Sequence, residues 1–375
     1  MRIAYFTHSL ASCWNHGNAH FLRGVMRELV RRGHQAVALE PTDGWSRSNL
    51  VASQGCYAIE RFRKDFPELV SVSYDAGFPH EEWLGEADVV IVHEWTDPAL
   101  VERIGRARRA GSFTLLFHDT HHRAVTAGAD IAALRLEHYD GVLAFGAALA
   151  DRYVRAGWSG RAFVWHEAAD TGRFRPLPET GRSADLVWVG NWGDGERAAE
   201  IGEFLVEPVR ALRLSGTVHG VRYPPAALAA LASAGLRYEG WIANADVPRA
   251  FAAHRVTVHI PRRPYVESLP GIPTIRMFEA LACGIPLVSA PWTDCEALFR
   301  PGRDYLSARN GSEMRQHLDA ILHDAGLAAS LARSGLETVR ARHGCAHRVD
   351  QLFDILARCG AAGAADQLAA REAAQ

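Results

Sequence analysis

Several patterns that would indicate a particular class of protein are missing from this sequence. The six cysteines are spread over 375 residues without a CxxC pair, which argues against a disulfide framework and against structural zinc. No apolar run approaches the length of a membrane-spanning helix, and the apolar run at the N-terminus is too short for a signal peptide. We therefore expect a soluble, cytoplasmic protein without a membrane span.

Neither sign of charge is in large excess. The chain carries 41 Lys and Arg residues against 43 Asp and Glu residues. This balance argues against a protein that coats nucleic acid or an anionic membrane, although it is compatible with a local basic groove. The HExxH pattern of zinc enzymes is absent, the loop after the first expected strand lacks the GxGxxG spacing, and no Walker A loop is found.

Length and composition favour two α/β domains. The chain has 375 residues, of which 48% are hydrophobic, so two domains with separate cores can form. Residues 171–183 contain proline and glycine with little apolar periodicity, which suits a domain boundary. We expect an N-terminal domain over 1–178, a C-terminal domain over 179–345, and a C-terminal helix and tail over 346–375.

The first half of the chain follows the order of a doubly wound parallel sheet. Apolar runs of strand length, with helices between most of them, are found at 3–6, 35–39, 88–92, 113–117, 140–145 and 163–165. Residues 41–80 have weak periodicity and are expected to be loops with one helix. In such a sheet, ligands bind at the carboxyl ends of the strands.

Polar clusters stand directly after three of these strands. The clusters are His93 with Glu94; His118 with Asp119, His121 and His122; and His166 with Glu167. The density of histidine leaves metal binding open, but the spacing fits no familiar zinc site, so acid–base chemistry is the favoured interpretation. Gly17, Asn18 and His20 are expected at the mouth of a cleft at the same edge of the sheet.

The second half of the chain repeats this order. A buried strand enters a glycine-rich turn at 190–197, and a helix follows. Glycines let backbone N–H groups approach a phosphate closely, although an ordinary strand–helix turn has the same pattern. Three further strands are expected at 214–219, 236–240 and 256–260, and a short helix at 296–299. Amphipathic helices are expected at 312–323 and 327–342, and a last helix at 349–358.

The segment at 271–290 carries the strongest functional signal. Pro273 suits the start of a helix, Gly284 suits its end, and a buried strand follows. Arg276 and Glu279 share one face of this helix near its N-terminus, where free N–H groups favour an anion. The pair is either a simple helical ion pair or part of a site for a sugar diphosphate nucleotide, whose ribose hydroxyls would bond the carboxylate.

These segments resemble GT-B glycosyltransferases. The resemblance spans nearly the whole chain and is carried by residues 17–24 with 31–34, 189–197, 220–224, 240–241 and 276–286, of which the last is the most specific. In detail it is similar to the CgeB-like, group 1 type related to family 4. It implies two Rossmann-like, doubly wound domains that face an interdomain cleft, with a C-terminal helix that returns to the N-domain.

The resemblance also implies roles for individual residues. Glu279 matches the glutamate that binds the donor ribose, and Trp241 and Ile242 lie on the segment that holds the nucleotide base. His118, at a strand end, resembles a histidine that faces the transferred sugar. The residues placed near the donor diphosphate are Gly17 and Asn18 on the N-domain and Gly190, Asn191, Arg197, Arg262 and Arg276 on the C-domain.

One position departs from the family pattern. Family 4 enzymes commonly carry two glutamates with seven residues between them, but the first of these positions is Gly271 here. The nearest upstream carboxylate is Glu267. Whether the reaction retains or inverts the configuration of the sugar therefore stays open.

The expected function is transfer of a sugar from a nucleotide diphosphate-sugar to an acceptor hydroxyl of a glycan, protein, lipid or small molecule. Nucleic acid is not expected as the acceptor. His93, Glu94, His118 and Asp119 would manage the proton of the acceptor, and arginines would offset the charge of the leaving diphosphate without a metal or another cofactor. Two alternatives remain: a nucleotide-sugar epimerase or hydrolase, and a non-catalytic sugar-nucleotide-binding protein of coat assembly.

Overall fold

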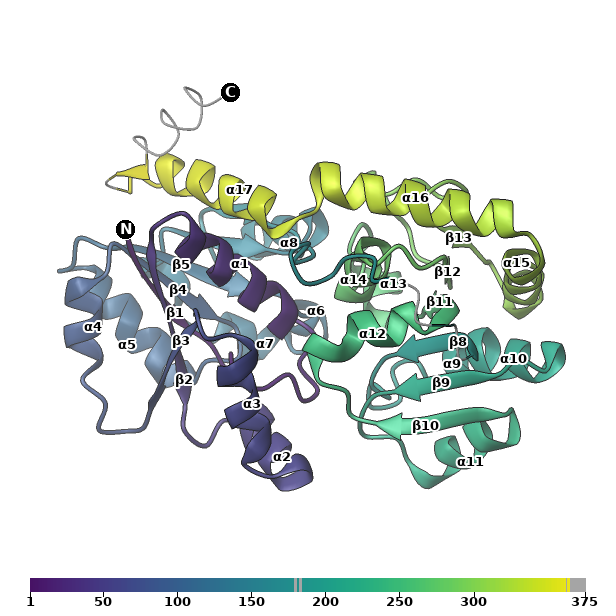
Figure 1. Ribbon diagram of the computed structural model, residues 1–375. Coiled ribbons are helices and arrows are strands. Elements are labelled where there is room, and N and C mark those ends of the chain that lie inside the picture. Colours follow the sequence, from purple (N-terminus) through teal and green to yellow (C-terminus); the bar gives the residue numbers. More distant parts are fainter. Residues whose placement is uncertain (179–180, 182–183, 362, 365–375) are drawn as a thin grey trace. The chain divides into compact units, whose positions relative to one another are not determined.

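The computed structural model describes residues 1–178, 181, 184–361 and 363–364, and it divides into two units. The first unit comprises Met1–Glu167 and Cys345–Gln375, and the second comprises Ala168–Gly344. Part of the expected boundary segment and most of the expected C-terminal tail lie outside the described residues. Each unit contains one parallel sheet (Figure 1).

The sheet of the first unit has seven strands in the order β3-β2-β1-β4-β5-β6-β7. All neighbouring strands pair in parallel. The strands are β1 (Arg2–Phe6), β2 (Gln35–Pro41), β3 (Val70–Tyr74), β4 (Val89–His93), β5 (Thr114–Asp119), β6 (Gly141–Ala144) and β7 (Ala162–Val164). The strand order reverses between β1 and β4, and ligands of doubly wound sheets bind outside the carboxyl ends of the strands at such a point.

Helices connect these strands because each parallel crossover must return the chain to the same end of the sheet. The helices of the first unit are α1 (Ala19–Arg31), α2 (Trp45–Gln54), α3 (Tyr57–Asp65), α4 (His80–Glu86), α5 (Pro98–Arg108), α6 (Arg123–Thr126), α7 (Gly128–Ala132), η1 (Leu136–His138), α8 (Ala147–Arg155) and α17 (Cys345–Arg358). The central strands β4 and β5 are buried along their whole length. This explains why both read as nearly continuous apolar runs in the sequence.

The C-terminal helix α17 packs beside α1 (Figure 1). Arg32 Nη1 lies 2.6 Å from Asp350 Oδ1, which ties the end of α1 to α17. The Trp165 indole N–H donates to the carbonyl of Arg348 at 2.8 Å, and the buried Arg348 Nε donates to the carbonyl of His166 at 2.8 Å. The expected return of the last helix to the N-terminal domain is therefore confirmed.

The sheet of the second unit has six parallel strands in the order β10-β9-β8-β11-β12-β13. The strands are β8 (Ala184–Val189), β9 (Gly216–His219), β10 (Leu236–Gly240), β11 (His254–His259), β12 (Leu287–Ser289) and β13 (Leu306–Ser307). The helices are α9 (Ala198–Ile201), η2 (Gly202–Val206), α10 (Glu207–Leu212), α11 (Pro225–Ser233), η3 (Asn244–Asp246), α12 (Val247–Ala252), α13 (Arg263–Ser268), α14 (Ile275–Ala282), α15 (Gly311–His323) and α16 (Ala325–Arg342). The prediction of two Rossmann-like, doubly wound sheets is confirmed.

Two local predictions were wrong. Residues 41–80 contain α2, α3 and β3 rather than loops with one helix; β3 is an edge strand whose alternating valines and serines are mostly exposed or half-buried. Residues 296–299 do not form a helix. Ala297 has a φ of +51°, and the Asp294 carboxylate instead accepts hydrogen bonds from the N–H groups of Leu298 and Phe299 at 3.0 and 2.8 Å.

Candidate functional site

Helix α14 of the second unit carries a buried ion pair. The Glu279 side chain is 0% exposed and that of Arg276 is 24% exposed, and the Arg276 guanidinium donates to Glu279 Oε2. Asn244 Nδ2 donates to Glu279 Oε1 at 3.0 Å. A carboxylate buried this deeply needs such partners, because an isolated buried charge is costly. The expected pairing of Arg276 with Glu279 is thus present, at a helix that Gly284 ends with a φ of +67°.

Arg197 forms a cationic centre close to this pair. It is buried, and its Nη1 and Nη2 donate to the carbonyls of Ile260 at 2.7 Å and Asn191 at 2.5 Å. Its Nε has no hydrogen-bond partner within the described ranges. Burial, followed by repulsion from Arg262 and Arg276, lowers the pKa of Arg197 to about 10, so it remains cationic at neutral pH.

The glycine-rich turn after β8 lets two arginines approach its backbone. Gly193 has a φ of +79°, and a Cβ at this position would lie 3.3 Å from the Nε atoms of both Arg197 and Arg262. The Glu196 carboxylate accepts from Arg262 Nη1 at 3.0 Å. A glycine is therefore required here both for the left-handed backbone and for the close approach of the guanidinium groups.

Gly190 and Asn191 join the loops after β8 and β9. The Gly190 carbonyl accepts from the Tyr223 hydroxyl at 2.7 Å, and Asn191 Oδ1 accepts from the Val221 N–H at 3.0 Å. A Cβ on Gly220 would lie 2.0 Å from the Gly190 carbonyl oxygen, so only glycine allows this approach. These contacts give both sequence-predicted residues a role in shaping the carboxyl edge of the sheet.

Trp241 and Ile242 directly follow β10, and both are half-buried. Trp241 Nε1 is buried and has no hydrogen-bond partner among the residues that the structure describes. The two residues therefore stand at the carboxyl edge of the second sheet, together with the loops after β8 and β9.

His259, the last residue of β11, was not selected from the sequence. Its ring is fully buried, with Nδ1 2.8 Å from Ser289 Oγ and Nε2 3.1 Å from Thr274 Oγ1. Burial, with a smaller effect of Arg197, lowers the pKa of His259 to about 3, so the imidazole is neutral. This neutral ring connects the ends of two strands to Thr274, which directly precedes α14. A histidine at a strand end was the available signal.

Gly271 cannot be replaced by a larger residue without rearrangement. Its φ is +87°, and a Cβ there would lie 2.7 Å from Glu296 Oε1 and 2.9 Å from Cys295 Sγ. The loop after β12 thus occupies the space into which a glutamate at position 271 would project. Glu267, the nearest upstream carboxylate, is exposed on α13.

In the first unit, the ends of β4 and β5 bring His93 and His118 together. The two rings are 5.6 Å apart between centroids, and their Cα atoms are directly paired across the strands. His93 Nε2 lies 3.2 Å from Asn18 Nδ2 and 3.1 Å from Thr120 Oγ1. The Tyr5 hydroxyl contacts His118 Nδ1. Burial lowers the pKa of His118 to about 3, so this ring is neutral.

Glu94 and Asp119 form a buried pair beside these histidines. Glu94 Oε1 accepts from the Thr120 N–H at 3.2 Å, and Asp119 Oδ2 accepts from the Tyr153 hydroxyl at 2.6 Å. Burial and then the Asp119 carboxylate raise the pKa of Glu94 well above its usual range, while Arg123, 3.9 Å from Glu94 Oε2, opposes this effect. Burial also raises the pKa of Asp119. The four residues predicted for acid–base chemistry are therefore assembled at one sheet edge.

Two further histidines extend this group but were not selected from the sequence. The His8 ring lies 3.8 Å from the ring of His16 and 5.3 Å from that of His93, between centroids. Both come from the loop between β1 and α1, which also contains the half-buried Gly17 and the buried Asn18. The position of His8 directly after β1 was a usable signal. We call His8, His16, His93 and His118 the histidine cluster.

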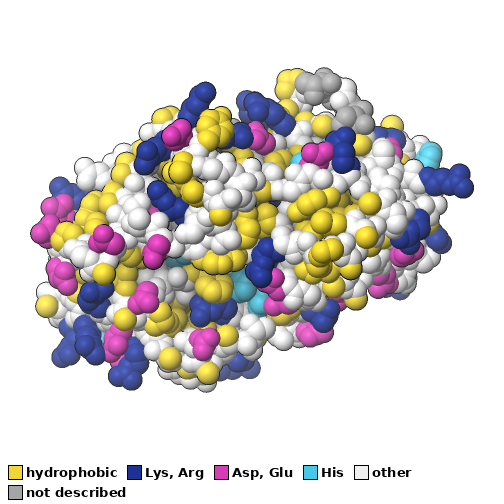
Figure 2. Space-filling model, turned by 90° about the horizontal axis from the view of Figure 1, so that it is seen from below, with side chains coloured by type: hydrophobic (Ala, Val, Ile, Leu, Met, Phe, Trp, Pro, Cys, Tyr) yellow, Lys and Arg dark blue, Asp and Glu magenta, His cyan; other side chains and the backbone are white. Residues whose placement is uncertain are grey.

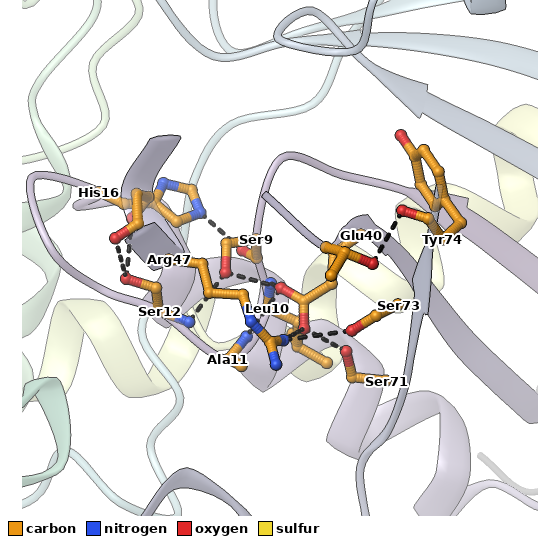
Figure 3. A network of polar contacts seen from close by, with 12 residues as sticks. Ser9, Leu10, Ala11, Ser12, His16, Glu40, Arg47, Ser71, Ser73 and Tyr74 are labelled. Carbon is orange, nitrogen blue, oxygen red and sulfur yellow. Dashed lines mark hydrogen bonds and ion pairs between the residues drawn. The ribbon is translucent and has the colours of Figure 1, made fainter. Parts of the chain in front are cut away.

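A buried carboxylate holds the β1–α1 loop in place (Figure 3). Glu40, at the end of β2, is fully buried, and its Oε2 accepts from Ser9 Oγ at 2.7 Å and the Leu10 N–H at 2.9 Å. Its Oε1 contacts Ser71 Oγ on β3 and Arg47 Nη1, the latter at 3.5 Å. Figure 3 shows Glu40 between the loop and β3. Its position thereby fixes the backbone next to His8, which sequence patterns did not reveal.

Other sequence-predicted residues occupy different environments. His166 Nδ1 lies 2.9 Å from the carbonyl of Phe145, and His122 Nδ1 lies 3.0 Å from Thr126 Oγ1. His20 is buried at the start of α1. These contacts are typical of histidines that stabilise local structure.

Three further properties bear on possible partners: the distribution of surface charge, the grouping of metal-ligating side chains, and the length and apolar character of the helices. Basic and acidic side chains are interspersed over the face shown in Figure 2. Within the described ranges, no three His, Cys, Asp or Glu side chains are grouped so that they could hold a metal ion. None of the helices in the described part of the chain combines the length and apolar character needed to cross a membrane.

Comparison with known proteins gives one family match and many structural matches. Residues 197–354 match the family described as glycosyl transferase-like. A search of curated proteins found no match. The matched range includes Arg197, Arg262, Arg276 and Glu279, and it therefore covers most of the arginine and glutamate residues described above in the second unit.

The structural matches extend over almost the whole chain. Sucrose-phosphate synthase from Thermosynechococcus elongatus is 14% identical, with a TM-score of 0.67, and the match covers 97% of this chain and 100% of that one. HepE from Anabaena, in complex with UDP and glucose, is 14% identical with a TM-score of 0.70, and the match covers 95% of this chain and 99% of that one. An alpha-glucosyltransferase in complex with UDP and DNA is 12% identical with a TM-score of 0.68, and the match covers 95% of this chain and 99% of that one. The chain therefore has the GT-B fold of glycosyltransferases.

Proposed function

We propose that this protein is a cytoplasmic GT-B glycosyltransferase that moves a hexose from a nucleotide diphosphate-sugar to an acceptor hydroxyl. The observation that carries the proposal is the Arg276–Glu279 pair on α14, beside Arg197, inside the range that matches the glycosyl transferase-like family. The CgeB-like type suggested by the sequence is part of this proposal.

The second unit would bind the donor. A ribose hydroxyl that donates to Glu279 would take over part of the bonding that Arg276 provides, and Arg276 could then turn to the diphosphate. Arg197 and Arg262 add positive charge at the glycine-rich turn. Cations that are already in position before the reaction stabilise the negative charge that develops on a leaving diphosphate. The arginines would supply this stabilisation without a metal or another cofactor. Gly190, Asn191, Trp241 and Ile242 would shape the edge that receives the phosphates and the base.

The first unit would handle the acceptor. The low pKa of His118 keeps its ring neutral, so the ring can accept a hydrogen bond from the acceptor hydroxyl. In the proposed reaction, the acceptor oxygen bonds to the anomeric carbon, the bond to the diphosphate breaks, and the acceptor proton passes to the histidine cluster. Glu94 and Asp119 would hold the strand ends and tune the electrostatic field, while Gly17 and Asn18 would approach the phosphates.

We propose uridine as the base, because HepE is described with UDP-glucose and the alpha-glucosyltransferase with UDP. Titration calorimetry with UDP tests the donor site. Glu279→Ala and Arg276→Ala should each weaken UDP binding about tenfold or more, since hydrogen bonds to charged groups contribute roughly 1.5–3 kcal/mol. Glu337→Ala, which removes an exposed glutamate of α16, is the matched control and should bind UDP like the unaltered chain. Unchanged UDP affinity in both test variants would contradict the donor site.

Turnover separates this proposal from its alternatives. An epimerase would convert UDP-glucose to another UDP-sugar without an acceptor, and a hydrolase would release free sugar. A non-catalytic binding protein would bind UDP and turn over no donor with any acceptor. A glycosyltransferase should release UDP in proportion to the glycosylated product.

A further inference from the structure

We propose that the exposed indole of Trp95 and the histidine cluster form the binding site for a carbohydrate acceptor. This assignment as an acceptor site rests on the proposed function. Trp95 is two residues beyond the end of β4, and its side chain is 46% exposed. Large aromatic side chains usually bury most of their surface, so an indole held in the open at a ligand-binding edge is a candidate contact surface.

Neighbouring groups fix the position of this indole. The Arg123 guanidinium lies over the Trp95 ring, 4.4 Å from its centroid, and Arg123 Nη1 donates to the carbonyl of Glu94 at 2.9 Å. The backbone N–H of Trp95 donates to His93 Nδ1 at 3.4 Å, which holds the backbone that carries the indole. A cation over one face, anchored to the backbone, restrains the ring before any ligand arrives, which lowers the entropy cost of binding.

The polar half of the site lies next to Trp95. The His8 ring is 6.5 Å from the Trp95 ring and 5.3 Å from the His93 ring, between centroids. The buried atoms of this region without a hydrogen-bond partner among the described residues include three from the histidine cluster and Asn18: His8 Nδ1, Asn18 Oδ1 and His118 Nε2. Because buried polar atoms are nearly always paired in native proteins, these three point to a ligand that supplies hydrogen bonds.

A carbohydrate satisfies both halves of this environment. A pyranose ring has an apolar face of C–H groups that stacks on an indole, and it carries hydroxyls in several directions that both donate and accept. The three unpartnered atoms belong to three separate segments, at the ends of β1 and β5 and at the start of α1, so a ligand that bonds all three must carry several hydrogen-bonding groups. A flat phenolic ring would stack on Trp95 but would carry fewer hydroxyls toward them.

Binding of three trisaccharides, measured by saturation-transfer NMR and calorimetry with saturating UDP, tests the inference. The probes are cellotriose, maltotriose and N-acetylchitotriose, with quercetin as the phenolic comparison. At least one trisaccharide should bind, and Trp95→Ala should weaken its binding about tenfold or more, because the substitution removes both the apolar area and the aromatic contact of the indole. Trp95→Phe should retain part of the affinity.

Tyr57→Ala removes another exposed aromatic residue, on α3, and should leave trisaccharide binding unchanged. The inference is overturned if no trisaccharide binds, if quercetin alone binds, or if Trp95→Ala binds like the unaltered chain. UDP affinity of the same samples keeps the two proposals apart. Trisaccharide binding without UDP binding would refute the proposed UDP donor site but not the carbohydrate site, whereas UDP binding without any trisaccharide would refute the carbohydrate site.

Discussion

Replacement of Glu40 should loosen the loop that carries half of the histidine cluster. Glu40 Oε2 accepts from Ser9 Oγ, the Leu10 N–H and, at 3.4 Å, the Ala11 N–H. Glu40→Ala leaves these buried donors without their acceptor, and each unsatisfied buried group costs about 1–3 kcal/mol. The Ser9 hydroxyl can rotate toward another acceptor, whereas the two amides cannot. We therefore expect a loss of roughly 3–5 kcal/mol in the free energy of local opening.

Glu40→Gln separates the role of the acceptor from that of the charge. The glutamine carbonyl can still accept from the Leu10 N–H, and its amide can donate to Ser71 Oγ, which now accepts. Only the contact with Arg47 is lost: its Nη1, 3.5 Å from Glu40 Oε1, would then face the N–H donors of the glutamine amide instead of a carboxylate oxygen. The expected cost is about 1 kcal/mol, typical of one hydrogen bond.

Hydrogen exchange measured by mass spectrometry on a peptide that covers residues 8–14 provides the local readout. In Glu40→Ala the amides of Leu10 and Ala11 should exchange about a hundredfold faster or more, because each 1.4 kcal/mol corresponds to a factor of ten. Glu40→Gln should raise the rate about fivefold. Arg47→Ala is the control, since it removes a long contact and leaves the amides bonded to Glu40. Equal protection in Glu40→Ala and the unaltered chain would refute the reasoning.

Two further predictions concern pH and a glycine. The folded-state pKa of His118, about 3, lies below its ordinary value of 6.5, so its contribution to stability is complete above pH 6.5 and is lost as the pH falls toward 3. At pH 5 this loss is about 2 kcal/mol. The free energy of unfolding, measured by urea titration, should therefore fall less between pH 7 and pH 5 in His118→Asn than in the unaltered chain. An equal fall in both proteins would contradict the prediction. Gly271→Ala should destabilise the chain by about 2 kcal/mol or more through its positive φ and its collision with Glu296, while Gly302→Ala, with a φ of +78° and open space around it, should cost only about 1 kcal/mol in thermal unfolding. Similar melting temperatures for the two glycine variants would show that the collision with Glu296 is relieved at no cost.

The two sheets could be predicted because most of their strands are buried. An uninterrupted apolar run such as β4 has few alternative interpretations when helical patterns stand on both sides of it. Strand β3 lacks this signal because it lies at the sheet edge and alternates valine with serine. The expected helix at 296–299 does not form, because Ala297 takes a positive φ and the Asp294 carboxylate bonds the N–H groups of Leu298 and Phe299. Side-chain competition of this kind depends on how the loop is held, which local periodicity does not record.

The predicted site residues differ in how far the sequence alone could place them. Arg276 and Glu279 are three residues apart on one helix, so helical geometry alone predicts their contact. The companion of this pair, Asn244, comes from 35 residues upstream and could not be inferred from spacing. The same limit applies to His259, whose partners are contributed by the next strand and by the residue before α14.

The histidine cluster shows why the acceptor side was the harder half to infer. Asn18 contacts His93 across 75 positions of sequence, and Tyr5 contacts His118 across 113. What unites them is the parallel sheet, which places every strand end at one edge, so a polar residue after each strand is automatically a neighbour of the others. A sequence therefore reveals the members of such a cluster but not their partners. The partners decide the chemistry here, because burial is what keeps the His118 ring uncharged and free to exchange hydrogen bonds as a neutral group.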